Sequence, residues 1–306
     1  MSRLRLIAFL GCLVVACSSA PGAVGRGVDT FVAASGVTLH VHTVGASSAA
    51  ETLIAVHGGP GLDAVSMGPY DTLAGANRRV ITYDQRGAGR STSPADADYR
   101  IAAQVADLEA VRVAANAPTV ELVGESWGGA VAAAYTAAHP DRVHALVLVG
   151  AVPLDRAELR AGEQRFLAYI SHLQGQHLIV TPLPSAARGS CLPTVRASLP
   201  AYAADPRHVP EVSLGTCTAA TSRATYDAFL SDAGVDGLAS QLASYRGRAL
   251  VVMGDHDAFG VQWLHRNIGL LSGARVDQLL VVNAGHIVAA EQPSTLFGRI
   301  ATFLAA

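Results

Sequence analysis

A serine set between glycines is the residue in this chain whose type and surroundings most directly indicate chemistry. The segment Gly124-Glu125-Ser126-Trp127-Gly128-Gly129 follows the apolar residues 120–123 and precedes an alanine-rich run. This order is typical of a strand, a sharp turn and a helix, and small neighbours permit the strained backbone that lifts a serine hydroxyl clear of a sheet edge. Ser126 is therefore the predicted nucleophile, at a helix N-terminus that favours developing negative charge. A tight turn with a solvated serine is the alternative.

A serine hydroxyl attacks at neutral pH only when a base accepts its proton and a third group orients that base. Two acidic residues and two histidines follow the last two expected strands, in Gly254-Asp255-His256-Asp257 and Asn283-Ala284-Gly285-His286. His286 is the predicted base, because the glycine before it leaves room for an imidazole. Asp257 is preferred to Asp255 as the orienting acid, because it lies further beyond the end of the strand and can turn toward the histidine.

A glycine-rich loop, His57-Gly58-Gly59-Pro60-Gly61, directly follows the apolar residues 52–56. Backbone amides in such a loop can approach a ligand closely, and amides fixed at a strand end are suited to stabilise an oxyanion. The predicted donors are the amides of Gly59 and of Trp127, the residue after the nucleophile. His57 is expected to brace this loop. The alternative is a turn without a catalytic role.

A second polar loop, residues 84–91, follows the expected strand at 79–83 and contains Asp84 and Arg86. These charged residues could be catalytic. Loops dense in Gly, Asp and Arg are more often held together by side-chain hydrogen bonds to the backbone and by ion pairs. A structural role is therefore predicted for both residues.

Strand and helix patterns alternate along most of the chain. The expected strands lie at 30–34, 37–44, 52–56, 79–83, 120–123, 143–149, 248–253 and 276–282, with helices at 99–116, 130–138, 261–271 and 287–304. Continuous apolar runs are typical of strands buried on both faces, and the alternation predicts a parallel sheet with right-handed crossovers.

The pattern is interrupted between residues 154 and 245, where six prolines from 182 to 210 break the helices into short pieces. This segment is predicted to be an inserted cap and not an independent domain. The expected organisation is a core formed by residues 30–153 and 246–306, with the cap between its two parts.

The first 16 residues are predicted to be an export signal. Two arginines precede an apolar run at 6–16, which is too short to span a bilayer as a permanent helix. The following Val14-Val15-Ala16-Cys17 resembles the lipobox of bacterial lipoproteins, which implies cleavage before Cys17, lipidation of its thiol and a tether over residues 17–29. An ordinary signal peptide cut at Ala20 is the alternative.

Either signal predicts an exported protein, held in the bacterial cell envelope by a lipid anchor or else periplasmic or secreted. Disulfides persist in such oxidising compartments. Cys12 lies in the signal, so Cys191 and Cys217 remain and are predicted to form a disulfide. Two buried free thiols are the alternative.

The charge of the chain and the motifs it lacks argue against nucleic acid as a partner and against a metal ion or nucleotide cofactor. The 306-residue chain has 15% charged residues and a formal net charge of −2, which does not favour nucleic acid. It contains no His-Glu-x-x-His or Cys-x-x-Cys motif and no nucleotide-binding loop. No metal ion or cofactor is expected. The expected partner is a small molecule or a short peptide, and the oligomeric state is left open.

Five motifs occur in order along the chain, and together they resemble the α/β-hydrolase family and, within it, the prolyl iminopeptidase group. They are His57-Gly58-Gly59-Pro60-Gly61, Asp84-Gln85-Arg86-Gly87-Ala88-Gly89-Arg90-Ser91, Gly124-Glu125-Ser126-Trp127-Gly128-Gly129, Gly254 with Asp257, and Gly285-His286. The resemblance implies a mostly parallel eight-stranded sheet flanked by helices, with an inserted, mainly helical cap.

For function, the resemblance implies release of an N-terminal residue, often proline, through an acyl-enzyme. Ser126 would attack the scissile carbonyl, His286 would move the proton and Asp257 would orient His286. The amides of Gly59 and Trp127 would hold the oxyanion.

The cap departs from this group, because the tryptophan-and-glutamate segments that would anchor a substrate amine are not found. Glu158, Glu163 and Glu211 are expected to be solvated surface charges, and Glu125 beside the nucleophile is a candidate substrate-binding residue. Two alternatives follow. One is an esterase or other small-molecule hydrolase of the same fold, and the other is a catalytically silent lipoprotein that binds a ligand in the envelope.

Overall fold

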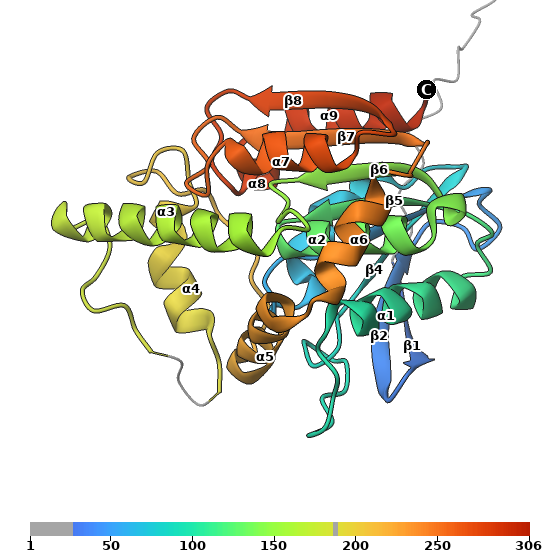
Figure 1. Ribbon diagram of the computed structural model, residues 1–306, viewed down its shortest axis with the longest axis horizontal. Helices are drawn as coiled ribbons and strands as arrows, with labels where there is room; N and C mark the ends of the chain where they lie inside the picture. Colours follow the sequence, from blue (N-terminus) through green and yellow to red (C-terminus); the bar gives the residue numbers. More distant parts are fainter. Residues whose placement is uncertain (1–26, 186–188) are drawn as a thin grey trace, which may run out of the picture.

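The computed structural model describes residues 27–185 and 189–306, in which helices surround one central sheet (Figure 1). The strands are β1 (Val28–Ala34), β2 (Val37–Val44), β3 (Glu51–Val56), β4 (Arg78–Tyr83), β5 (Val120–Glu125), β6 (Val143–Val149), β7 (Arg248–Gly254) and β8 (Arg275–Val281).

The α-helices of the described residues are α1 (Ile101–Ala114), α2 (Trp127–Ala138), α3 (Arg156–Gly175), α4 (Leu192–Ser198), α5 (Ala219–Ser231), α6 (Gly234–Leu242), α7 (Gln262–Leu270), α8 (Val288–Glu291) and α9 (Pro293–Leu304). Three 3-10 segments, η1 (Ala64–Leu73), η2 (Pro140–Arg142) and η3 (Leu199–Ala201), join them.

The eight strands form one sheet in the order β1-β2-β4-β3-β5-β6-β7-β8. The pairs β1·β2 and β2·β4 are antiparallel, and all other pairs are parallel. The predicted mostly parallel, eight-stranded sheet is confirmed. Because the six parallel strands end at the same edge, the loops that follow β3, β5, β7 and β8 can meet there.

Both faces of the sheet are buried along its central strands, which explains the continuous apolar runs of β3, β5, β6 and β7. Along β6, Leu146 and Leu148 face the helix layer that contains α1, α2, α6 and α7, whereas Val147 and Val149 face η1 and α9. The side chains alternate because successive residues of a strand point to opposite faces.

The segment between β6 and β7 adds no strand within the described residues. In Figure 1, α3 and α4 lie on the side toward which the arrowheads of β6 and β8 point. Phe166, Ile170 and Leu173 of α3 pack with Ile179 and Ala201 in a separate apolar cluster.

The last helix of that segment has a different environment. Val235 and Leu242 of α6 are fully buried in the main core, where α6 packs with α2. By its packing, α6 therefore belongs to the layer that covers the sheet, although it lies inside the range 154–245 expected for the cap. The boundaries of the cap stay a prediction.

The closing helix expected at 287–304 is divided into α8 and α9. Pro293 starts α9 at its first helical position, where its missing N–H leaves no hydrogen bond unmade, whereas inside one continuous helix it would remove a bond.

The predicted export signal and lipidated Cys17 lie outside the described residues, as does most of the tether expected at 17–29. Among the residues that the structure describes, no helix is both long and apolar enough to cross a membrane.

Candidate active site

Ser126 lies on the sharp turn between β5 and α2, with backbone angles φ 53° and ψ −119°. The turn is tightly enclosed. A Cβ at Gly124 would lie 2.5 Å from the carbonyl oxygen of Gly128, and a Cβ at Gly128 would lie 2.0 Å from that of Val56. Only glycine fits at these positions, and this explains why the serine is flanked by glycines.

Three side chains from separate loops form one hydrogen-bonded chain. His286 Nε2 lies 2.9 Å from Ser126 Oγ, and His286 Nδ1 lies 2.8 Å from Asp257 Oδ2. Because an ionised carboxylate only accepts hydrogen bonds, Nδ1–H donates to Asp257 and Nε2 is left to accept from the serine hydroxyl. The arrangement is that of a nucleophile, a base and a group that holds the base in one tautomer.

Burial and charge act on His286 in opposite directions. The residue is 6% exposed, and its burial by itself would lower the pKa of the imidazole, but the Asp257 carboxylate raises that pKa above its ordinary value by charge and hydrogen bonding. Phe259 contributes in two ways: its ring lies 4.7 Å from the imidazole, centroid to centroid, and its backbone N–H donates to Asp257 Oδ1 at 2.9 Å.

Asp255, the weaker candidate for the acid, makes different contacts. Its Oδ1 accepts from the backbone N–H of Ala284 at 3.2 Å and lies 2.6 Å from His256 Nδ1. It therefore ties the loop after β7 to the loop after β8. His286 hydrogen-bonds Asp257 instead.

His57 braces the glycine-rich loop from inside the protein. Its Nδ1–H donates to Gly58 O at 2.7 Å, and its Nε2 accepts from the backbone N–H of Gln85 at 3.0 Å. Burial lowers the pKa of His57, which favours the neutral form that these two bonds require. Gln85 in turn accepts at 3.0 Å from the indole N–H of Trp127, so this network extends to the residue after Ser126.

The charged residues of the loop at 84–91 are structural. Asp84 accepts hydrogen bonds from the backbone N–H groups of Ala64 and Arg90, both at 2.8 Å. Arg86 is 2% exposed and binds Asp107 through Nε and Nη2, both at 2.7 Å. These contacts account for both charges without a catalytic role.

A cavity of about 230 Å³ opens above Ser126. It is lined by Gly58, Gly59, Pro60, Leu62, Ser66, Glu125, Ser126, Cys191, Val195, Leu199, Tyr202, Val212, Leu214, Cys217, Ser222, Phe259, His286 and Ile287. Gly59 lies in this wall with φ +128°, and Trp127 begins α2 directly after the serine. Their role as oxyanion donors stays a prediction.

Larger hollows exist elsewhere. One of about 760 Å³ lies beside β1, β2 and the end of α1, and its lining contains none of the three hydrogen-bonded residues. Chemistry and not size therefore identifies the smaller cavity as the candidate site.

Glu125 is the only carboxylate among the described residues that line this cavity. Its Oε2 accepts from the Tyr70 hydroxyl at 2.9 Å, and burial raises the pKa of its carboxyl. The cap glutamates lie elsewhere: Glu158 pairs with Arg165, and Glu163 accepts from the hydroxyl of Tyr226.

Two residues that hold parts of the site in place were not predicted from the sequence. Tyr70 lies in η1, which has no clear sequence periodicity. Glu291 of α8 accepts from the backbone N–H groups of Gly285 and Ala204, both at 2.6 Å, and so holds the loop that carries His286. No motif surrounds either residue. The available signal for Glu291 was its position five residues after His286, where the structure places it as the last residue of α8.

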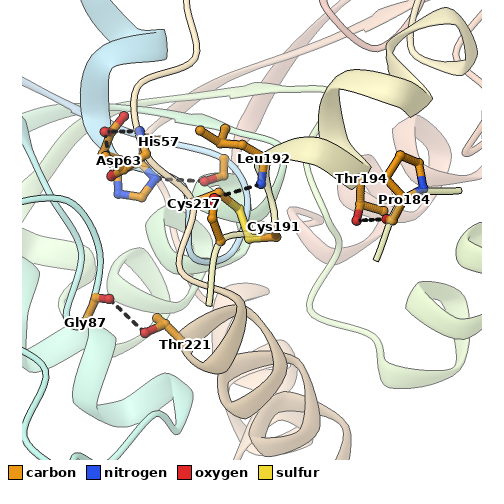
Figure 2. The surroundings of a disulfide bond; sticks show 12 residues. His57, Asp63, Gly87, Pro184, Cys191, Leu192, Thr194, Cys217 and Thr221 are labelled. Atoms are coloured by element: carbon orange, nitrogen blue, oxygen red, sulfur yellow. Dashed lines mark hydrogen bonds between the residues drawn. A yellow bond between two sulfur atoms is a disulfide. The ribbon is translucent and has the colours of Figure 1, made fainter. Parts of the chain in front are cut away.

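Cys191 and Cys217 form a disulfide, with their Cα atoms 5.2 Å apart. Figure 2 shows His57 and Asp63 on one side of this bond and Thr194 with Pro184 on the other. Across residues 27–185 and 189–306, no three or more His, Cys, Asp or Glu side chains are grouped so that they could hold a metal ion. The absence of a cofactor stays a prediction.

The chain resembles known proteins in its sequence. The family model described as alpha/beta hydrolase fold matches residues 51–293. The proline iminopeptidase of Lactiplantibacillus plantarum is 36% identical over 132 residues, which are 42% of this chain and 45% of that relative. The 2-hydroxy-6-oxo-2,4-heptadienoate hydrolase of Pseudomonas putida is 35% identical over 127 residues, 41% of this chain and 45% of that relative.

The matched stretches thus span less than half the length of these curated relatives. Over most of the chain, the likeness is one of fold. The crystal structure of the proline iminopeptidase of Mycobacterium smegmatis has a TM-score of 0.64 at 20% identity, covering 91% of this chain and 98% of that one. The family model covers well over half of the sequence, and the sheet, the strained serine turn and the Ser-His-Asp geometry agree with it: the chain belongs to the α/β-hydrolase family.

Proposed function

We propose that this protein is a serine hydrolase that forms an acyl-enzyme and releases the N-terminal residue of small peptides. The observation that carries the proposal is the chain of hydrogen bonds from Ser126 through His286 to Asp257, placed in the wall of a cavity. Curated relatives named proline iminopeptidase support the peptidase assignment.

In the first half of the reaction, Ser126 Oγ attacks the substrate carbonyl carbon while His286 Nε2 takes the hydroxyl proton. The tetrahedral oxyanion is held by the amides of Gly59 and Trp127. His286 then returns the proton to the leaving amine, and the C–N bond breaks to give the acyl-enzyme. Asp257 stabilises the imidazolium throughout. Water, deprotonated by His286, attacks the ester and releases the acid in the second half.

An aminopeptidase also needs a partner for the free amine of its substrate. Glu125 meets this need, because its carboxylate lies in the wall beside the nucleophile and no other acidic residue of the described chain does. Binding of an ammonium group would favour the ionised carboxylate and offset the burial that raises its pKa.

A second candidate function is an esterase or another small-molecule hydrolase. The observation that favours it is the wall above Ser126, where Val195, Leu199 and Leu214 present apolar surface suited to an uncharged acyl group. A Ser-His-Asp arrangement with an oxyanion hole serves esters as well as amides.

The deciding experiment compares proline and alanine p-nitroanilides with p-nitrophenyl acetate and butyrate, with Ser126→Ala as the control. The proposal expects cleavage of the free-amine anilides, its loss on N-acetylation of the substrates, and a fall of about 10⁶-fold in kcat in the variant. Ester turnover alone would favour the esterase. Turnover of neither class above the variant would contradict both and favour a silent ligand-binding protein.

We also propose that the protein is exported and held in the cell envelope through lipid on Cys17. The lipobox-like residues 14–17 and the disulfide, which persists in an oxidising compartment, support this. A Cys17→Ser variant should lose incorporation of labelled palmitate and leave the membrane fraction in expressing bacteria. Unchanged membrane association without label would contradict the anchor.

A further inference from the structure

We propose that the Cys191–Cys217 disulfide positions the catalytic machinery, by joining the loop that carries the oxyanion donor to the loop that carries His286. This inference rests on the proposed serine chemistry of the site. It concerns how the reacting groups are held and is independent of the acyl group that the enzyme accepts.

The segment around Cys217 contacts the glycine-rich loop that contains Gly59. Leu62 and Cys217 form an antiparallel bridge, and the N–H of Thr218 donates to Gly61 O at 2.8 Å. A Cβ at Gly61 would lie 2.7 Å from Thr218 O, so the two segments touch without space between them. The loop that contains Gly59 is therefore aligned by backbone bonds to the segment that holds Cys217.

Asp63 strengthens the same junction. It is 7% exposed, and its Oδ2 accepts from the backbone N–H of Thr216 at 2.5 Å and from the hydroxyl of Thr216 at 2.8 Å. The backbone N–H of Asp63 donates to Thr216 O at 3.2 Å. A charge-assisted pair of bonds thus fixes the residue directly before Cys217.

The second contact is with the loop that carries the base. The N–H of His286 donates to Tyr202 O at 2.8 Å, and Glu291 binds the N–H groups of both Ala204 and Gly285. A Cβ at Gly285 would lie 2.3 Å from Tyr202 O. The segment around Tyr202 is therefore the support against which the backbone of His286 rests.

These two supports are connected by an irregular path and by a short path that is mainly helical. Residues 203–216 contain no helix or strand. The other path runs from Cys217 across the disulfide to Cys191, then through α4 and η3 to Tyr202. Cys191 N–H also donates to Cys217 O at 3.1 Å. The disulfide makes the mainly helical path continuous, so it fixes the distance between the oxyanion loop and the histidine loop.

The test measures the rate at which a fluorophosphonate probe labels Ser126 in the exported full-length chain, because this reaction needs the serine, the base and the oxyanion donors but no particular acyl group. In a Cys191→Ala, Cys217→Ala double variant, the labelling rate should fall at least about tenfold, since small displacements of reacting groups cost large factors in rate. For p-nitrophenyl acetate, kcat should fall by a similar factor, with KM changed less than about threefold.

Two controls separate positioning from stability. Labelling is measured well below the thermal midpoint of each variant, with near-UV circular dichroism to verify tertiary packing. Thr302→Val is the matched control: Thr302 lies on α9, outside the path through the disulfide, and its hydroxyl donates to Gly298 O at 2.8 Å, so the labelling rate of this variant should equal that of the unmodified protein. In a double-mutant cycle, Asp63→Ala should add little to the loss in the cysteine variant.

A folded double-cysteine variant that labels within about twofold of the unmodified rate would overturn the inference and leave the proposed hydrolase intact. Full additivity of Asp63→Ala with the cysteine variant would also overturn it, because the disulfide would then not act through that junction. An unmodified protein that takes no label at Ser126 would overturn the serine chemistry and the inference with it.

Discussion

The hydroxyl of Tyr70 donates a 2.9 Å hydrogen bond to Glu125 across 55 residues of chain. It links η1, on one face of the sheet, to the residue directly before the nucleophile. The bond engages Oε2, and among the described residues no hydrogen bond engages Oε1. Glu125 is therefore held in orientation through one oxygen, and the proposed amine anchor would use the other.

Glu125→Gln should raise KM for free-amine anilides about 10- to 100-fold, because the amide keeps the shape and the Tyr70 bond but loses the charge that an ammonium group needs. Steady-state kinetics with alanine p-nitroanilide provide the measurement, and p-nitrophenyl acetate is the uncharged control. Equal effects on both substrates would show that Glu125 acts on the site as a whole and does not anchor an amine.

The pH profile of kcat/KM should rise to a plateau as His286 loses its proton, because the neutral imidazole is the base. Its folded-state pKa is raised by Asp257, so the midpoint should lie above about 6.5, the value of an unperturbed histidine. The profile is recorded with an uncharged ester, so that the substrate does not titrate. A midpoint below 6.5 would contradict the net effect of the Asp257 charge.

Asp257→Asn should lower kcat by about 10⁴-fold, because an amide does not hold Nδ1 protonated and Nε2 unprotonated. It should also shift the midpoint of the pH profile to lower pH, since the charge that raises the pKa of His286 is removed. Asp255→Asn is the matched control, because Asp255 binds Ala284 and His256. A larger fall in kcat for Asp255→Asn than for Asp257→Asn would show that Asp255 is the acid that orients His286.

Asp107→Ala should lower the free energy of unfolding by about 3–5 kcal/mol, because it leaves the buried guanidinium of Arg86 without its carboxylate. Chemical denaturation with a fluorescence readout measures the change. Replacing Arg86 and Asp107 together with Met and Leu should cost much less, since no charge is then stranded. A small effect of the single change would mean that water reaches the site.

Local sequence was sufficient for the strands and for the order of the site residues along the chain. The apolar runs of β3, β5 and β6 predict strands buried on both faces, and glycines at 124 and 128 are required wherever a serine stands on so tight a turn. Residue order also predicted which loops follow which strands. These features depend on backbone sterics and side-chain periodicity, which act over a few residues.

Contacts between distant segments were decided only in the folded chain. Tyr70 meets Glu125, Glu291 holds Gly285, and Asp63 binds Thr216, although no motif marks these partners. The division of the closing segment into α8 and α9 and the packing of α6 on α2 also needed the structure.

The sequence by itself thus determined the strand pattern, the strained serine turn and the residue types available for catalysis, because each follows from short-range constraints. Tertiary structure alone decided that His286 reaches Ser126 and Asp257 at hydrogen-bond distance and that one carboxylate lines the cavity. The physical reason is that such distances are set by how the sheet, its covering helices and the segment between β6 and β7 pack together. That packing is a sum of many weak contacts between residues far apart in the chain.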